Sequence, residues 1–392
     1  MTLDKKRSIF ALLALAVSAF AIGTTEFISV GLLPLISEDL HIPVTTAGLT
    51  VSLYALGVTF GAPILTSLTS SMSRKTLLLL IMIVFIVGNS LAASSTSVGI
   101  LLFARVISAF SHGVFMSIGS TIAANLVPEN KRASAISIMF TGLTVATVTG
   151  VPLGTFIGQQ FGWRAAFLAI ILVGIIALIA NSILVPSDLP KGARTTFKDQ
   201  FKLLSNGRLL LLFIITALGY GGTFVVFTYL SPLLQHVTGF KEGVVAVILL
   251  VYGIAIAIGN VIGGKLANQN PLKALFYMFI VQAIILIVLT FTAPFKTAGL
   301  ITIIFMGLLA FMNVPGLQVH VVTLAEKFVP SAVDVASAIN IAAFNAGIAI
   351  GSYVGGIITD SIGLIHTAWI GGFMVMGAVI LTGWSRLLEK QD

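Results

Sequence analysis

Glu26 is the strongest candidate in this sequence for a residue that takes up and releases a proton, because it is an acid inside a long apolar segment. It lies in AIGTTEFISVGLLP, residues 21–34, and no other charged side chain occurs between Ile9 and Ile36. That segment exceeds the ~20 apolar residues with which a helix crosses a membrane. An ionised carboxylate at that depth is costly, so such an acid indicates a protonation or binding site. The alternative is a carboxylate near the end of the span that interfacial water solvates.

A second set of polar residues lies in LLFARVISAFSHGVFMSIGS, residues 101–120. Arg105, Ser108 and His112 share one helix face, because seven residues turn through about 700°. The Arg105 guanidinium stays charged and must face water, an acid or helix carbonyls; the alternative is a side chain that reaches the headgroups at the membrane edge. His112 fits a proton relay and a hydrogen-bonded packing role equally well. Glu26, Arg105 and His112 are therefore the candidate proton-coupling residues.

The second half of the chain contributes neutral polar and aromatic side chains instead. Amides inside apolar segments can hold a polar substrate or bond to neighbouring helices, and aromatic rings can line a pocket or pack together. The candidate substrate-binding residues are Phe224, Phe227, Asn313, Gln318, Asn340, Phe344 and Asn345.

The composition indicates that membrane-spanning helices position these residues. Of 392 residues, 57% are hydrophobic and 9% are charged, and the mean hydropathy is +1.10, whereas soluble domains have roughly 25% charged residues. About twelve apolar segments without the period-two alternation of a barrel predict an all-α integral membrane protein. The long polar stretch at 187–208 divides it into a six-helix bundle at 1–186 and another at 209–392. The chain has no cysteine, and we expect no metal and no cofactor.

Lysine and arginine are distributed unevenly between the two sides of the predicted membrane. Seventeen of the 21 fall on the side of the N-terminus, three on the opposite side, and Arg105 lies within a span. By the positive-inside rule, both termini are cytoplasmic. The net charge of +8 therefore reflects topology, and a nucleic-acid partner is not expected. The N-terminal run is interpreted as a retained first helix, in a monomeric, multi-pass protein of the cell membrane.

The two halves of the chain are related by an internal repeat. Offsets of 197–198 residues align Pro34 with Pro232, Lys75 with Lys273, and a run of three glycines with Gly347, Gly351 and Gly355. Two parallel six-helix halves are typical of transporters whose substrate site lies near the membrane midplane. Glu26 aligns with Phe224, so the acid is not repeated. A structural need common to both halves would recur, which favours a chemical role for Glu26.

The glycine run belongs to TGVPLGTFIGQQFGWR, residues 149–164. Gly150, Gly154 and Gly158 form one smooth helix face that lets another helix backbone approach closely. Pro152 lacks a backbone N–H and can bend the helix. We expect this face to form a water-tight seam between the halves; the alternative is tight packing alone.

These motifs resemble those of the major facilitator superfamily, in particular its twelve-helix drug:proton antiporter group with sugar-efflux, nucleoside-efflux and chloramphenicol-resistance members. GVPLGTFIGQQFGWR at 150–164 is similar to the antiporter motif of the fifth helix, ARVISAFSHG at 104–113 to the fourth-helix motif, and GTTEFISVGLLP at 23–34 to a first-helix signature. The resemblance covers essentially the whole chain. It implies the major facilitator fold, a role of Arg105 in proton transfer and protonation of Glu26.

The loop between the second and third helices departs from the family pattern, which reads roughly G-x-L-A-D-R-x-G-R-K. Aligning its basic pair on Arg74 and Lys75 places Ser70 at the aspartate position, and Asn268 takes that position in the second half. A gate that depends on this aspartate is therefore in doubt. We expect Arg74 and Lys75 to act in gating by meeting helix C-termini.

The sequence thus predicts a proton-coupled exporter of a small molecule, a drug, sugar or nucleoside-like compound, that works by alternating access. The direction of transport rests on the resemblance. A facilitator without proton coupling, or a sensor on a transporter scaffold, is the alternative. An enzyme is not expected, because the sequence shows no paired acids, no His-Glu-x-x-His helix and no nucleophile with its base, and the short loops leave no room for a catalytic domain.

Overall fold

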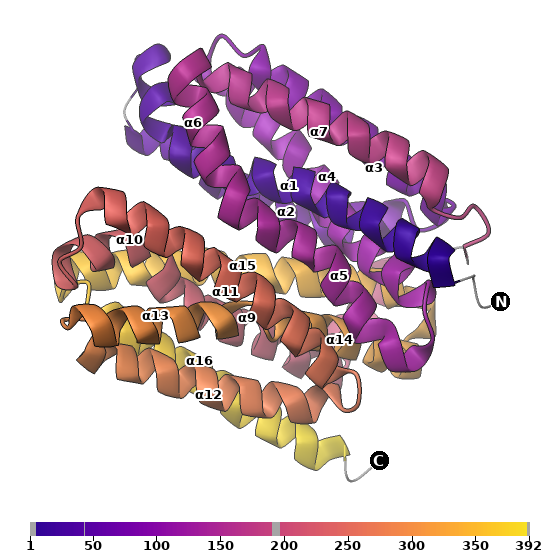
Figure 1. Cartoon of the computed structure of the whole chain (residues 1–392). Helices are drawn as coiled ribbons and strands as arrows, with labels where there is room; N and C mark the ends of the chain where they lie inside the picture. The colour runs from indigo at the N-terminus through magenta and orange to yellow at the C-terminus, as the bar shows by residue number, and fades with distance from the viewer. Residues whose placement is uncertain (1–4, 43, 190–196, 390–392) are drawn as a thin grey trace.

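The computed structural model describes residues 5–42, 44–189 and 197–389 of the chain. In these ranges the regular structure is helical, and twelve helical segments are long and apolar enough to cross a membrane. The predicted all-α membrane fold with twelve spans is confirmed. Both ends of the chain lie at one end of the molecule, which we call the terminal end (Figure 1).

The first half is a bundle in which α1 packs against α5 and α7, while α2 and α3 pack against α4. Its helices are α1 (Lys5–Asp39), α2 (Val44–Leu68), α3 (Arg74–Ala93), α4 (Val98–Asn125), α5 (Arg132–Val145), α6 (Val151–Phe161) and α7 (Trp163–Leu184). In the second half, α9 packs against α15 and α16, and α12 packs against α16. Its helices are α9 (Gly207–Phe227), α10 (Leu230–Pro232), α11 (Glu242–Ala267), α12 (Pro271–Thr292), α13 (Lys296–Ala310), α14 (Val314–Phe328), α15 (Val333–Ser361) and α16 (His366–Glu389).

The long polar stretch between the halves contains the short helix α8 (Phe197–Ser205). Leu203 of this helix is fully buried, and the Gln200 side chain donates to the Pro63 carbonyl of α2 at 3.3 Å. Residues 190–196 of the predicted linker lie outside the described residues. The division at 1–186, 187–208 and 209–392 therefore stays a prediction.

Local sequence signals set where several spans begin. Ser73, Ser97, Asn206 and Asn270 precede α3, α4, α9 and α12, and each side chain accepts a hydrogen bond from a backbone N–H in the first turn. Such caps satisfy donors that a helix leaves free at its N-terminus. Gly162 links α6 to α7 with φ of +85°, a conformation that favours glycine.

Two of the spans are interrupted inside the bundle. The fifth span consists of α5, a π-helical turn (η2, Ala146–Gly150) and α6. Pro152 follows this turn and has no N–H to donate to the preceding turn, which explains a local change of helix type. The tenth span breaks at residues 311–313, between α13 and α14, and Pro315 lies at the start of α14.

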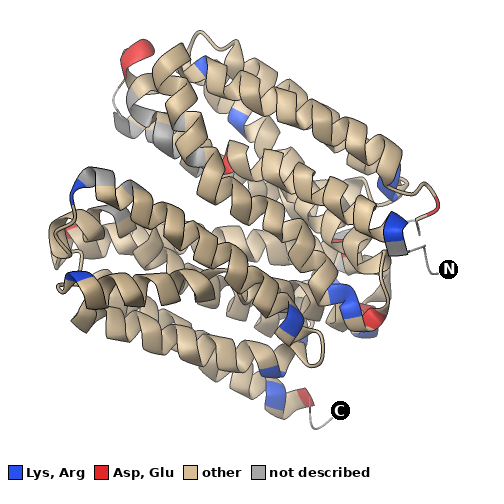
Figure 2. Ribbon diagram, viewed as in Figure 1, with Lys and Arg blue, Asp and Glu red and all other residues tan. Residues whose placement is uncertain are grey.

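The halves meet through helix pairs that follow the repeat. α2 packs against α15, and α5 packs against α11. Figure 1 shows the halves as two bundles, one indigo to magenta and the other pink to yellow. Figure 2 shows that most drawn Lys and Arg lie at helix ends, many of them at the terminal end, while the spans between are largely uncharged. This arrangement leaves few charges at membrane depth, so each of them needs an explanation.

Candidate functional site

A small cavity lies between the two halves and is lined by both. Its lining residues are Glu26, Phe27, His112, Met116, Phe140 and Leu143 from the first half, and Tyr220, Val314, Ile341, Phe344, Asn345 and Ile348 from the second. The cavity measures about 30 Å³, enough for one or two waters. Pockets for drug-sized ligands measure roughly 300–1,000 Å³. A substrate would therefore have to separate these walls to enter.

Glu26, the acid within the first span, lines this cavity. Its side chain is half-buried, and its carboxylate accepts no hydrogen bond from any residue in the described part of the chain. The neighbouring Thr25 hydroxyl donates to Asn89 Oδ1 of α3 at 3.2 Å. This hydrogen bond fixes α1 against α3, and the Glu26 carboxylate lies at the cavity.

Arg105 is fully buried on α4 and bonds to backbone carbonyls of two other helices. Its Nη1 and Nη2 donate to the carbonyls of Thr25 and Glu26 at 2.6 and 3.3 Å, and its Nε donates to the Thr50 carbonyl at 3.1 Å. Its guanidinium also lies 4.2 Å from the centroid of the Tyr54 ring. Of the environments considered for this arginine, the structure shows helix carbonyls, and full burial excludes a side chain that reaches the headgroups.

Tyr54 of α2 connects this arginine to the third predicted residue. Its hydroxyl lies 3.2 Å from Nδ1 of His112, which lines the cavity. Glu26, Arg105 and His112 are therefore brought together, with Tyr54 between the last two. Sequence reasoning missed Tyr54, although a tyrosine inside an apolar span needs a partner for its hydroxyl, which is a usable signal.

The predicted substrate-binding residues separate into three groups. Phe344 and Asn345 line the cavity. Phe224 and Phe227 lie behind it in an aromatic row, with ring centroids 5.3 Å apart. The row is continued by Tyr220, whose ring lies 5.1 Å from that of Phe224. Tyr220 lines the cavity and was missed by the sequence reasoning.

The remaining predicted amides bond to other protein groups. Thr216 donates to Asn340, Asn340 to Gln318, and Gln318 to Ser337, at 2.7, 2.8 and 2.5 Å. Asn313 lies at the break of the tenth span and donates to Gln282 Oε1 at 3.1 Å. These three amides hold helices of the second half together, which is the alternative that the sequence left open.

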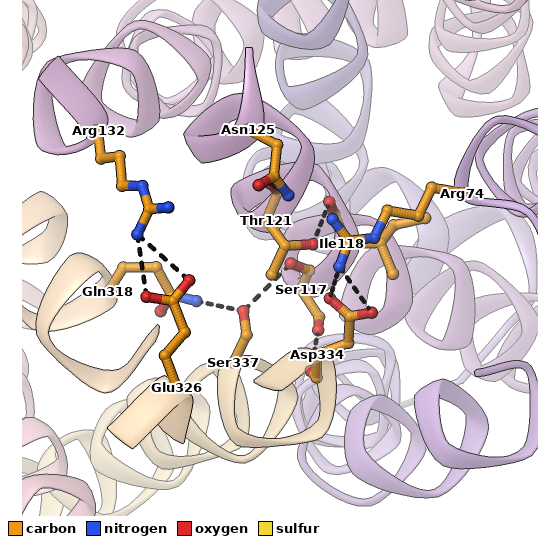
Figure 3. Close-up of polar contacts among 10 residues, drawn as sticks. All are labelled: Arg74, Ser117, Ile118, Thr121, Asn125, Arg132, Gln318, Glu326, Asp334 and Ser337. Atoms are coloured by element: carbon orange, nitrogen blue, oxygen red, sulfur yellow. Dashed lines mark hydrogen bonds and ion pairs between the residues drawn. The ribbon is translucent and has the colours of Figure 1, made fainter. Parts of the chain in front are cut away.

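The halves are joined at the terminal end by a buried ion pair and two serines (Figure 3). Arg74 Nη2 lies 3.1 and 3.2 Å from the two carboxylate oxygens of Asp334, in the first turn of α15. Ser117 donates to the Asp334 carbonyl at 2.8 Å, and Ser337 donates to the Ser117 carbonyl at 3.1 Å. We call these four residues the α15 lock. Asp334 was not predicted, because it lies at the edge of its span.

The α5–α11 seam adds further polar bonds between the halves. Asn268 bonds twice to Ser134, through a backbone N–H at 3.1 Å and a hydroxyl at 2.6 Å. Asn260 Nδ2 donates to the Ser137 carbonyl at 3.0 Å, and Ser137 Oγ donates to the Asn260 carbonyl at 2.9 Å. Arg132 also pairs with Glu326 of α14 at 3.0 Å (Figure 3).

Of the two basic residues expected to meet helix C-termini, Arg74 and Lys75, only Lys75 does so. Lys75 Nζ donates to the Ser182 carbonyl in the last turn of α7 at 2.8 Å, so it meets a helix C-terminus as expected. Arg74 does not, because it contacts a carboxylate at the N-terminus of α15. The acid missing at Ser70 is thus supplied by another helix.

The placement of the glycine face differs from the sequence interpretation. A Cβ at Gly150, Gly154 or Gly158 would meet Thr24, Ile28 or Leu32, all in α1. The face therefore packs within the first half, and a seam between the halves was the wrong expectation. The aligned Gly347, Gly351 and Gly355 pack in the same way against α9. In the seam between the halves, Gly253 and Gly264 of α11 lie against Val148 and Ser137 instead.

Comparison with known proteins identifies the family of this fold. The sequence profile described as the Major Facilitator Superfamily matches residues 15–329. The chain belongs to the Major Facilitator Superfamily. It is 82% identical over 392 residues to the MFS-type transporter YtbD of Bacillus subtilis (strain 168), covering 100% of this chain and 99% of that protein. It is 36% identical over 383 residues to the inner membrane transport protein YdhP of Escherichia coli (strain K12), covering 97% of each.

Solved structures of the superfamily share the fold. The human organic anion transporter MFSD10 (TETRAN) matches with a TM-score of 0.82 at 15% identity, over 97% of this chain and 100% of that one. The fucose:proton symporter FucP of E. coli matches with a TM-score of 0.75 at 16% identity, over 96% and 99%. The major facilitator fold inferred from the sequence is thereby confirmed, and the chain is a multi-pass membrane transport protein.

Proposed function

We propose that this protein is a proton-coupled secondary transporter that exports a small molecule across the cell membrane by alternating access. The observation that carries the proposal is the Glu26 carboxylate on a cavity between the halves, beside a buried Arg105 that donates to backbone carbonyls and lies against an aromatic ring. A drug, a sugar and a nucleoside-like compound remain the candidate substrates.

The arrangement of charges supports exchange of a proton for a substrate. When Glu26 is ionised, its charge offsets that of the neighbouring buried Arg105; when Glu26 is protonated, the charge of Arg105 is left without this counter-charge. A buried, unbalanced charge is unfavourable. Substrate binding and protonation therefore change the same electrostatic balance, and each can displace the other. His112 and Tyr54 would offer a path along which a proton reaches or leaves the cavity.

The inter-half contacts support a gate at the terminal end. If both termini are cytoplasmic, as the distribution of Lys and Arg predicts, the α15 lock closes the cytoplasmic side. The lock can open in a transport cycle because its ion pair is incompletely satisfied: Nε and Nη1 of Arg74 are buried, and neither has a hydrogen-bond partner among the described residues. A buried pair of this kind contributes little net stability, because desolvation offsets the attraction.

The interrupted fifth span supports a hinge role for the antiporter-like motif. Before the π-helical turn at Ala146–Gly150, α5 bonds to α11 of the other half; after it, α6 packs by its glycines against α1. Pro152 keeps the two segments from forming one regular helix. We assign Gly150, Gly154, Gly158 and Pro152 to this hinge, and Arg74 and Lys75 to the gate.

The test is transport by purified protein in proteoliposomes with an imposed proton gradient. A panel of fluorescent or labelled cations, sugars and nucleosides is screened for flux with and without a protonophore. Glu26→Gln should insert and fold normally but abolish gradient-driven flux, since the amide cannot titrate. Glu38→Gln, an exposed acid at the end of the same helix, is the matched control and should transport like the parent.

Two results would contradict this function. Flux that is independent of the proton gradient in the parent protein would identify a facilitator. Undiminished, protonophore-sensitive flux by Glu26→Gln would show that the proton is carried elsewhere.

A further inference from the structure

A second cavity lies inside the second half at the terminal end, away from the cavity between the halves. It measures about 260 Å³, and its walls come from the start of α9, the C-terminal half of α14 and the C-terminal end of α16. Its polar lining consists of Arg208, His320, Thr323, Lys327, Ser385 and Glu389. It shares no lining residue with the central cavity, so it belongs to a different site.

The lining of this cavity favours an anion. Among the residues that the structure describes, Arg208 and Lys327 contribute two cations to the lining and Glu389 contributes one carboxylate. His320 is 4% exposed, and its buried Nε2 has no hydrogen bond to any residue that the structure describes; it lies 3.7 Å from Glu389 Oε1. A buried ring nitrogen facing a cavity needs a polar partner. The cavity is large enough to hold one, because a water occupies about 30 Å³ in the liquid.

Helix capping accounts for part of this arrangement. Arg208 Nη2 donates to the Leu388 carbonyl near the end of α16 at 2.8 Å, and Lys327 lies in the last turn of α14, where cations stabilise a helix. Capping explains why cations occur here. It does not explain a cavity of this volume between them or the orphaned nitrogen of His320.

We propose that this cavity binds a phosphate group, supplied either by an anionic lipid headgroup or by a soluble phosphate. A guanidinium and an ammonium are the usual partners of phosphate oxygens. The site lies where three spans end, which is the depth at which basic pockets between helices meet headgroups. His320 Nε2 would donate to the same group.

Occupancy of this site would stabilise the position of α14. His320, Thr323, Leu324 and Lys327 form one stripe of that helix, since they are three or four residues apart. Glu326 lies off this stripe and accepts from Arg132 of the first half. Gln318 also lies off it and donates to Ser337 of α15, which in turn donates to the Ser117 carbonyl of the first half. A phosphate group would connect α14 to α9 and α16 and so support the closed arrangement of the terminal end.

The test is thermal unfolding of the purified full-length protein, followed by tryptophan fluorescence. One arm titrates inorganic phosphate against chloride at constant ionic strength. The other adds phosphatidylglycerol to the micelles, with phosphatidylcholine as the uncharged comparison. We expect a saturable rise in Tm of several °C in at least one arm. A rise with phosphatidylglycerol but not with inorganic phosphate identifies a lipid headgroup. A rise with inorganic phosphate identifies a soluble ligand.

Two variants connect that rise to this cavity. Lys327→Gln, at an exposed position, removes one charged hydrogen bond to the phosphate group. It should raise the half-saturation concentration roughly tenfold. Thr323→Phe fills the cavity and keeps its charges, and it should abolish the rise. Lys273→Gln, an exposed lysine at the start of α12, controls for loss of charge. No saturable rise with either probe, an equal rise with phosphatidylcholine, or a parent-like rise in both variants would overturn the proposal.

Discussion

The interiors of the two halves differ in chemistry although their helices are related by a repeat. In the first half, Glu26, Arg105 and His112 bring ionisable groups to membrane depth, and Arg105 donates to three backbone carbonyls. In the second half, Asn340 and Gln318 belong to a chain of neutral hydrogen bonds. The repeat preserves how helices pack, while the chemistry of each interior has diverged.

This difference suggests a division of labour between the halves. A satisfied amide network makes a region rigid, whereas a carboxylate without a hydrogen bond in the described structure is free to change its protonation state. We therefore expect the first half to carry the coupling and the second half to shape the substrate site. The following predictions test that comparison.

The largest effect is expected at Arg105. Arg105→Ala should reduce gradient-driven flux by more than tenfold, and should cost several kcal/mol of stability, because hydrogen bonds of charged groups contribute about 1.5–3 kcal/mol each. Arg105→Lys keeps the charge but cannot reach carbonyls of two helices with a planar fork, so it should also impair transport. Flux assays and thermal unfolding measure both effects. Parent-like transport by Arg105→Ala would remove the coupling role of the first half.

A smaller effect is expected at the α15 lock. Arg74→Gln leaves the nearly buried Asp334 without its cation, and breaking a buried pair costs about 3–5 kcal/mol. Because the loss applies only to the closed arrangement, the terminal end should open more often. Labelling of Ala338→Cys, a fully buried position on α15 in a chain without cysteine, should accelerate by about tenfold or more, because each 1.4 kcal/mol changes an equilibrium tenfold. Asp334→Asn combined with Arg74→Gln removes both charges and should label more slowly than Arg74→Gln alone. Equal labelling rates in parent and Arg74→Gln would show that the pair does not hold the halves together.

The aligned glycines allow a direct comparison of the two halves. A Cβ at Gly154 would meet the end of the Ile28 side chain, which can move, whereas a Cβ at Gly351 would meet the backbone of Gly221. We expect Gly351→Ala to destabilise the protein by about 1–3 kcal/mol, as overpacking does, and Gly154→Ala to cost less. Unfolding temperatures of the two variants decide the matter. The reverse order would mean that the two glycine faces are not packed as the structure shows.

The smallest effect is expected at an ion pair within the first half, at the end opposite the termini. Arg164 Nη1 lies 2.7 Å from Asp39, and this hydrogen bond holds the pKa of the Asp39 carboxyl below its usual value. The stabilisation is present above the usual carboxyl pKa of ~3.9 and is lost as the pH falls through the lowered value. Asp39→Asn should therefore lower stability near pH 7 by less than about 1 kcal/mol, because the pair is partly exposed, and should match the parent in acid. A shift in labelling of Ala338→Cys by this variant would contradict the assignment of gating to the pairs between the halves.

Much of the fold follows from the sequence. Twelve apolar segments without period-two alternation determine an all-α membrane protein, because a helix satisfies its own backbone hydrogen bonds inside the hydrocarbon layer. The same reasoning singles out Glu26 and Arg105 as charged groups within spans, and their role in transport stays a prediction. Helical periodicity also indicates which residues share a face, as with Gly150, Gly154 and Gly158.

What each face meets was decided only by the tertiary structure. The glycine face packs against α1 of its own half, Arg105 meets carbonyls rather than an acid, and Arg74 finds its carboxylate 260 residues away on Asp334. Burial can be inferred from residue type, because the cost of a charge in hydrocarbon depends on the group itself. The partner of a buried group depends on how twelve helices rotate against one another, and that is settled by their packing together.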